Sequence, residues 1–189
     1  MSLQTWQETL VSAQVAGTNF TTYTTAKTVL PVGCLVTLPA NWWYIGRTLR
    51  VTVQGGISTL VTTPGTITLQ VNHGAVASWS SGAIQLNATA HTTIPFELVV
   101  TLTCRAFGSG SATNLMGIGH LSGRMFTFTA AQADQVNVGT DMIVPVTAPA
   151  VGTGFDGTAA QTLDFFAGFS ISNAANGIQV QNYIVEALN

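Results

Sequence analysis

Three runs of alternating apolar and polar residues between Arg47 and Arg105 constrain the fold more than any other feature of this sequence. Residues 49, 51 and 53 are apolar and the residues between them are polar, and residues 67–71 and 96–104 follow the same pattern. A period of two places every second side chain on the same side of a pleated strand. The three runs therefore predict antiparallel strands with one buried face. Residues 163–171 alternate in the same way, and we expect Phe165, Phe169 and Ile171 to be buried with the apolar residues of the three runs.

Turn signals separate the runs at short intervals. Pro64-Gly65 predicts a turn, Asn72-His73-Gly74 a hairpin, and Ser80-Ser81-Gly82 a second turn before a short strand. Many short strands with Gly and Pro turns favour an all-β fold, an antiparallel β-sandwich of the jelly-roll-like kind. We expect residues 1–25 to form an N-terminal arm or first strand, and residues 26–189 to form a single β-sandwich domain.

Local breaks in the pattern predict irregular strands. Gly55-Gly56 inside a strand indicates a bulge or a close approach of two backbones. In the last strand, residues 178–188, the apolar phase changes near Asn182, so we expect a one-residue bulge there. Pro145 places the brief strand at residues 143–147 on a sheet edge.

Among the residues at the polar positions of the strands, Arg50 or Arg105 could pair with Glu97 across strands.

Charged residues make up only 6% of the chain, whereas about 25% is usual. With 5 Lys and Arg and a net charge of -2, the chain lacks the basic stripe that nucleic acids or anionic membranes require. Mean hydropathy is +0.40, yet no apolar run is long enough to predict a membrane-spanning helix. We therefore expect no nucleic acid and no membrane partner.

Thr, Ser, Asn and Gln fill the polar positions. A surface of such uncharged residues has little charge repulsion to keep protein molecules apart. Coverage by partner subunits would explain it, although secreted β proteins and fibre domains can also be poor in charge. The N-terminal residues lack the basic and apolar regions of a secretory signal, so we expect use without export by that route.

No pattern of catalytic or metal-binding residues stands out. The seven carboxylates are scattered, the three histidines lie in separate segments, and Cys34 and Cys104 show no metal-ligand spacing. A carboxylate pair could still meet in space. We expect no enzyme, no cofactor and no metal, and we expect both cysteines to be buried free thiols.

Trp42-Trp43-Tyr44 is the main aromatic cluster, in a break between two predicted strands. It could be a stacking platform for sugar or an anchor in a protein interface, or it could cap the open end of the core. Trp6, near the predicted arm, is a further interface candidate. Arg47 joins the set as a contact to carboxylates of a neighbour.

The order of three segments resembles a family of structural proteins of tailed bacteriophages. The segments are Gly46–Val53, Thr63–Leu69, and Leu102–Arg105 before a Gly-rich turn, and the resemblance covers roughly residues 38–188. It implies a virion component with a jelly-roll-like domain. Proteins of this kind decorate capsids, often as trimers, or form parts of tails and fibres.

Composition and resemblance together lead to one main hypothesis. The chain is expected to be a capsid decoration (cement) protein of the virion, assembled in the bacterial host cytoplasm. Its expected partners are its own copies, as a homotrimer, and the major capsid protein or other virion proteins. The alternative is a carbohydrate- or receptor-binding module of a tail or fibre, with Trp42 or Trp43 exposed in a groove.

Overall fold

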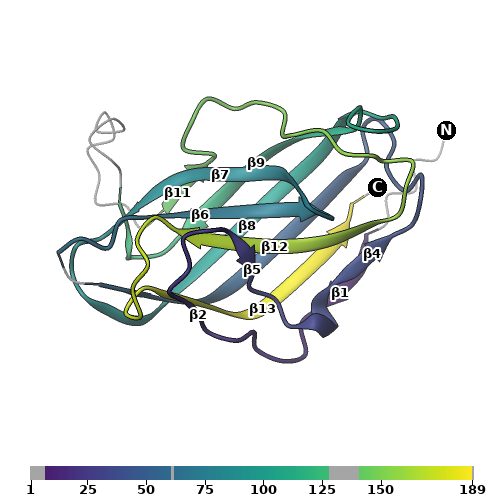
Figure 1. The fold of residues 1–189 in the computed structure, drawn as a ribbon. Coiled ribbons are helices and arrows are strands. Elements are labelled where there is room, and N and C mark those ends of the chain that lie inside the picture. Colours follow the sequence, from purple (N-terminus) through teal and green to yellow (C-terminus); the bar gives the residue numbers. More distant parts are fainter. Residues whose placement is uncertain (1–6, 61, 128–140, 189) are drawn as a thin grey trace.

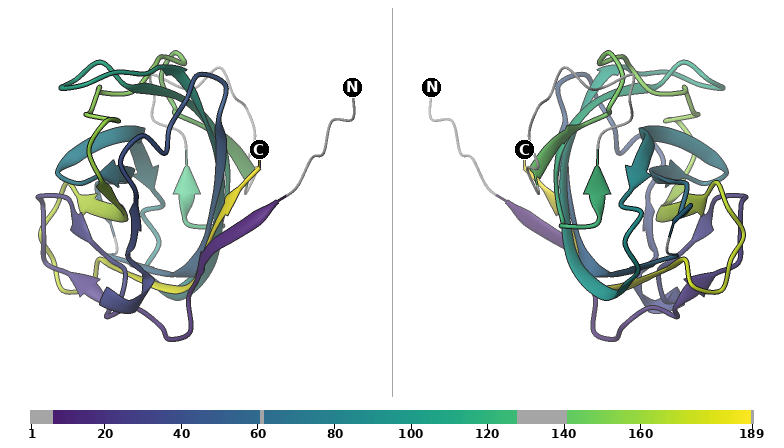
Figure 2. Two further views of the ribbon diagram at one scale, coloured as in Figure 1. Left: turned by 90° about the vertical axis from the view of Figure 1, so that its right-hand side faces the viewer. Right: turned by 90° about the vertical axis from the view of Figure 1, so that its left-hand side faces the viewer.

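A computed structural model describes residues 7–60, 62–127 and 141–188 of the chain. These residues form two antiparallel β-sheets that pack face to face, as the views in Figures 1 and 2 show. The apolar side chains of the alternating strands lie between the sheets and form the core. The predicted all-β antiparallel sandwich is therefore confirmed.

The larger sheet has seven strands within the described residues, in the order β1-β13-β5-β8-β9-β11, and β2 also pairs with β13. Its strands are β1 (Glu8–Ser12), β2 (Phe20–Thr21), β5 (Thr48–Thr59), β8 (His91–Ala106), β9 (Asn114–Ser122), β11 (Asp141–Val144) and β13 (Gly177–Ala187). Two of the three predicted alternating runs, residues 49–53 in β5 and 96–104 in β8, therefore lie side by side in this sheet. β11 lies at one edge, as the proline in its run predicted.

The second sheet has six strands within the same residues, in the order β10-β7-β6-β12-β3, and β4 also pairs with β12. Its strands are β3 (Lys27–Thr28), β4 (Val36–Leu38), β6 (Thr66–His73), β7 (Val76–Leu86), β10 (Phe126–Thr127) and β12 (Gln161–Phe169). A single 3-10 turn, η1 (Val32–Cys34), precedes β4. The β6–β7 hairpin is the one that Asn72-His73-Gly74 predicted.

The core contains the residues that alternation predicted to be inside. The buried members of that set are Leu49, Val51, Val53, Ile67, Leu69, Val71, Leu98, Val100, Leu102, Phe165 and Phe169. Ile171 was also predicted to be buried, but it is only half-buried because it lies beyond the end of β12. Cys34 and Cys104 are buried free thiols, as predicted, and burial raises the pKa of both.

Both predicted irregularities occur at one place in the larger sheet. The register between β13 and β5 shifts between Val180 and Asn182, which confirms the bulge. Gly55 lies opposite Val180, and a Cβ added there would lie 2.1 Å from the backbone oxygen of Gln179. The close approach of the two backbones thus explains why this position of β5 carries glycine.

The turn predicted at Ser80-Ser81-Gly82 is wrong, because β7 continues through it. Gly82 has a positive φ of 72°, and the β6–β7 register shifts nearby, between Thr68 and Gln70. The backbone N–H of Leu69 donates to the Ser81 hydroxyl at 2.9 Å. The hydroxyl thus accepts the hydrogen bond of a backbone N–H that the shifted register leaves without a backbone partner. For this reason the strand can kink at Gly82 and still continue.

The N-terminal segment closes one side of the sandwich. Its first two strands, β1 and β2, pair with β13 of the larger sheet, and β3 and β4 pair with β12 of the smaller one. Between these strands, the N–H of Gly17 donates to Val180 O and the N–H of Val29 donates to Phe165 O. Residues 8–38 therefore connect the two sheets along their adjoining sides (Figure 2).

Replacing Phe165 with alanine tests the assigned core. The ring is fully buried in β12, so Phe165→Ala should lower the free energy of unfolding by about 3–5 kcal/mol through lost burial and a residual cavity. Thr101→Ala, at an exposed position of β8, should change it by no more than about 0.5 kcal/mol. Denaturant unfolding followed by tryptophan fluorescence measures both, and equal effects of the two substitutions would contradict the assigned core.

Candidate interaction surfaces

The loop between β4 and β5, residues 39–47, turns one aromatic side chain into the end of the core. Trp43 is only 2% exposed, and its ring lies edge-on to those of His73 and Phe155, with centroids 5.4 and 6.4 Å away. The His73 ring in turn stacks on Phe155 at 4.2 Å. Trp43 therefore closes the end of the sandwich, and in this fold its ring is not available to a partner.

His73 and Ser78 form a buried, hydrogen-bonded pair. The pair contains the two residue types of a serine nucleophile and its base, but it is not arranged as such a site. The Nδ1 of His73 lies 2.7 Å from the Ser78 hydroxyl, which donates its own proton to Val71 O at 3.0 Å. Nδ1 therefore carries the proton and donates to the hydroxyl. Because both side chains are fully buried, no substrate reaches them, and burial lowers the pKa of His73 to about 3.

The outer part of the same loop is the more accessible part. The Arg47 guanidinium lies 3.8 Å from the centroid of the Trp42 ring and donates to Trp42 O at 2.5 Å. It also lies 5.2 Å from the Tyr44 ring. Tyr44 and Ile45 are 49% and 69% exposed. The structure thus brings Trp42, Tyr44 and Arg47 together, and the Arg47 guanidinium lies over one face of the Trp42 ring.

Trp6, the remaining predicted interface residue, lies outside the described residues. Of the other four candidates, Trp43 belongs to the core, whereas Trp42, Tyr44 and Arg47 form a small cation–π cluster at the surface. Whether that cluster contacts a partner stays a prediction.

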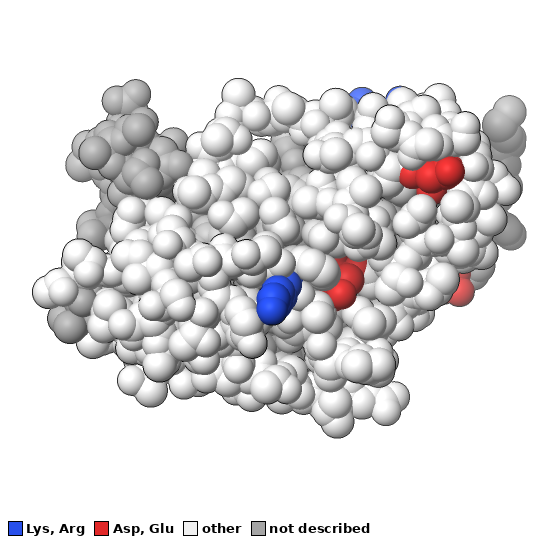
Figure 3. All heavy atoms as spheres, in the orientation of Figure 1, with Lys and Arg blue, Asp and Glu red and all other residues white. Residues whose placement is uncertain are grey.

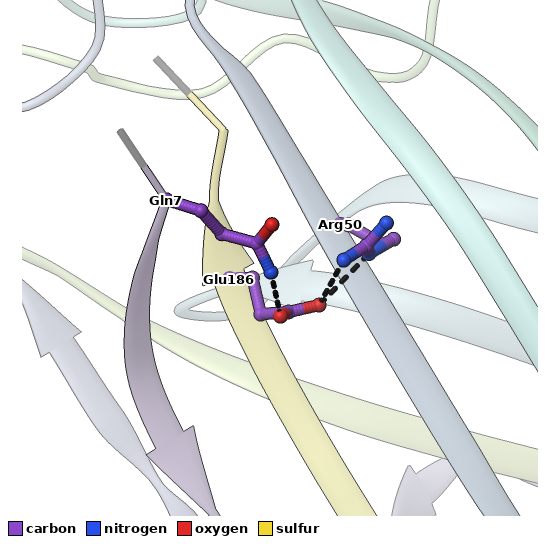
Figure 4. A network of polar contacts seen from close by, with 3 residues as sticks. All are labelled: Gln7, Arg50 and Glu186. Carbon is purple, nitrogen blue, oxygen red and sulfur yellow. Dashed lines mark hydrogen bonds and ion pairs between the residues drawn. The ribbon is translucent and has the colours of Figure 1, made fainter. Parts of the chain in front are cut away.

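Two charged residues on the outer face of the larger sheet neutralise each other. Arg50 pairs with Glu186 at 2.7 Å, and Gln7 donates to the other oxygen of that carboxylate, so the two side chains approach it from opposite sides (Figure 4). The expected pairing of Arg50 or Arg105 with Glu97 is wrong. Glu186 lies directly opposite Arg50 in the β13–β5 register, whereas the neighbour of Arg50 on β8 is Thr101.

An apolar strip crosses one edge of that outer face. Ile118 on β9, Ile143 on β11 and Val151 beyond β11 are 47%, 63% and 50% exposed, and half-buried Met116 pairs with Val151. Ile143 lies opposite His120, which puts it diagonal to Ile118 and within reach of it. These four residues are the apolar strip. Sequence reasoning missed it, although apolar residues on the outward phase of β9 were a visible signal.

A polar hollow lies on the same face at the site of the β13 bulge. It has a volume of about 660 Å³, and its polar lining side chains are Gln54, Glu97, Ser122, Arg124, Gln181 and Asn182. Asn182 Nδ2 donates to Gln54 Oε1 at 2.9 Å, and Gln54 Nε2 donates to Glu97 Oε2. Alternation assigned Gln54 and Glu97 to the polar phase, but only the register brings them beside Asn182.

The residues that the structure describes contain neither a metal-binding cluster nor a helix that could span a membrane. No group of three or more His, Cys, Asp or Glu side chains in that part of the chain could hold a metal ion. Likewise, none of its helices is long and apolar enough to cross a membrane.

Comparison with known proteins yields little. The sequence matches no known protein-family profile and no curated protein. Among solved structures, the CBM2 module of the evolved Dit of Lactobacillus casei BL23 phage J-1 is similar at a TM-score of 0.27 and 11% identity, over 82% of this chain and 69% of that chain.

The buried His73 should make stability depend on pH. Its pKa is about 3 in the folded chain and 6.5 ordinarily, so below about pH 6.5 the unfolded chain binds a proton that the folded chain does not. Above pH 6.5 the neutral His73 imposes no such penalty on the folded chain. Between pH 6.5 and pH 3, acidification lowers the free energy of unfolding by up to about 1.4 kcal/mol per pH unit. Unfolding free energies of the wild-type chain and His73→Phe, measured from pH 7 to pH 4, should differ in slope.

Phe155→Leu is the control for this comparison, because it removes the ring stacked on His73 and keeps the histidine. It should lower stability at every pH and keep the wild-type slope. A His73→Phe variant with the slope of the wild-type chain would show that His73 is protonated in the folded state.

Proposed function

We propose that this chain is a structural virion protein of a tailed bacteriophage, a capsid decoration protein that binds the shell and its own copies. The observation that carries the proposal is the apolar strip on a sheet face whose Arg50 and Glu186 charges are paired with each other. An exposed apolar strip of this kind supports coverage by another protein, because contiguous apolar patches on a protein surface are often interaction sites. Burial of apolar area is also the main driving force of protein association.

The rest of the surface can be buried against other subunits at a low desolvation cost. Only 6% of the residues are charged, and the face in Figure 3 shows a few scattered charged groups among uncharged atoms. Burying a hydroxyl or an amide that finds a hydrogen-bond partner costs far less than burying an unpaired charge. A chain of this composition can therefore place large parts of its surface in contacts with neighbouring subunits.

The phage assignment rests on the resemblance of residues 46–53, 63–69 and 102–105 to structural proteins of tailed phages. In that setting the partners are the major capsid protein or other virion proteins and further copies of the chain, as a homotrimer. The virion is the place of action, after assembly in the host cytoplasm. A role of this kind needs contact surfaces and no catalytic residues.

A tail or fibre module that binds carbohydrate or a receptor was the alternative. In its expected form it needed Trp42 or Trp43 open in a groove. Trp43 is buried, and Trp42 packs partly against the core with Arg47 over one face of its ring, so neither ring has the open position that this alternative expects. The decoration role is therefore the function that the geometry supports better.

Charged substitutions in the apolar strip test the proposal. The purified wild-type chain should sediment as a trimer at micromolar concentration, equally at low and high salt, because few charge pairs exist to be screened. Ile118→Asp with Ile143→Asp should give a folded monomer, since each aspartate would have to be buried in the contact. Far-ultraviolet circular dichroism checks that the variant keeps its fold.

Ala83→Asp is the matched control, at an exposed strand position of the smaller sheet. It should leave the trimer intact. Electron microscopy of the source particles with an antibody to the chain then tests its place in the virion. A wild-type chain that stays monomeric and is missing from the particles would contradict the proposed function.

A further inference from the structure

We propose that the polar hollow on the outer face of the larger sheet is a binding site for a neutral saccharide. The hollow is separate from the aromatic loop and shares no residue with the apolar strip. The proposal goes beyond the decoration role and does not depend on it. It would give the chain a second activity, the capture of uncharged sugar chains.

The hydrogen-bonding groups of the hollow form a row across four neighbouring strands. Asn182 on β13 lies opposite Gln54 on β5, Gln54 lies opposite Glu97 on β8, and Glu97 lies opposite Ser122 on β9. Neighbouring strands are about 4.8 Å apart. The row therefore presents a polar group at intervals close to the width of one sugar ring, and an extended saccharide could lie along it.

Contacts within the row hold the side chains ready to bind. Asn182 donates to the Gln54 carbonyl oxygen, and the Gln54 amide donates to one oxygen of Glu97. An amide NH₂ has two N–H donors, and a carboxylate accepts at both oxygens. The chain of bonds thus fixes the planes of three side chains and still leaves each of them capacity for a ligand. Fixing side chains before binding lowers the entropic cost of association.

The backbone irregularity of the sheet creates the space above this row. The bulge exposes Gln181 next to Asn182, so two consecutive residues of β13 line the hollow. Gly55 and Gly123 also line the hollow, and Pro95 offers an apolar surface. A sugar ring has an apolar C–H face and a rim of hydroxyls, which matches such a mixed lining. The volume falls in the usual range for small-ligand sites.

The charges of the hollow favour a neutral ligand. Its lining contains one acidic residue, Glu97, and one basic residue, Arg124. A phosphate or a nucleotide would lie beside a carboxylate and would find a single guanidinium, so anions gain little here. A purely apolar ligand would strip water from amides and a carboxylate without replacing the hydrogen bonds. Hydroxyl groups both donate and accept hydrogen bonds, so a sugar can bond to the amide, carboxylate and hydroxyl groups that line the hollow.

Titration with defined sugars, followed by NMR, tests the proposal. The probes are cellotriose, maltotriose and triacetylchitotriose, added to the ¹⁵N-labelled full chain. We expect saturable shifts of the Gln54 and Asn182 side-chain NH₂ signals with at least one of them, at a dissociation constant of about 1 mM or tighter. Gln54→Ala, or Glu97→Ala, should weaken that binding by at least about tenfold.

Thr101→Ala is the matched control, since Thr101 is exposed on the same face of β8, away from the hollow. It should bind like the wild-type chain. The proposal is overturned if none of the three sugars shifts these signals, if Thr101→Ala weakens binding as much as Gln54→Ala, or if glycerol gives the same shifts at the same concentrations. The trimer and particle measurements involve other residues, so either proposal can fail alone.

Discussion

The pairing of β5 with β13 on one side and with β8 on the other is the interaction on which the rest of the structure depends. It joins residues 48–59 to strands that lie far from them in sequence, with β13 near the end of the chain. The register turns Leu49, Val51 and Val53 inward. A slip of one residue would turn them to solvent, so burial of the core and register of the sheet hold each other in place.

The same register determines the chemistry of the outer face. It places Glu186 opposite Arg50, so these two opposite charges pair, and it places Gln54 between Asn182 and Glu97. The bulge in β13 then places Gln181 beside Asn182 in the lining of the hollow. The pairing of these strands thus contributes to the core, to the pairing of the surface charges and, together with β9, to the hollow.

The proposed decoration role and the proposed saccharide site use different parts of this face. The apolar strip lies at the β9–β11 edge, and the polar row runs from β13 to β9. The aromatic loop has mainly a structural role, because Trp43 packs against His73 and Phe155 at the end of the core. Its exposed large hydrophobic residues are Tyr44 and Ile45.

The sequence by itself determined the class of fold, nearly all of the predicted core and the bulge near Asn182, because a period of two and its phase change are local properties of a strand. Only the tertiary structure decided that Arg50 meets Glu186, that Trp43 points inward, and that the strand through Gly82 kinks without ending. These outcomes depend on which strands become neighbours and in what register. Such pairings join residues distant in the chain, and no local pattern specifies them.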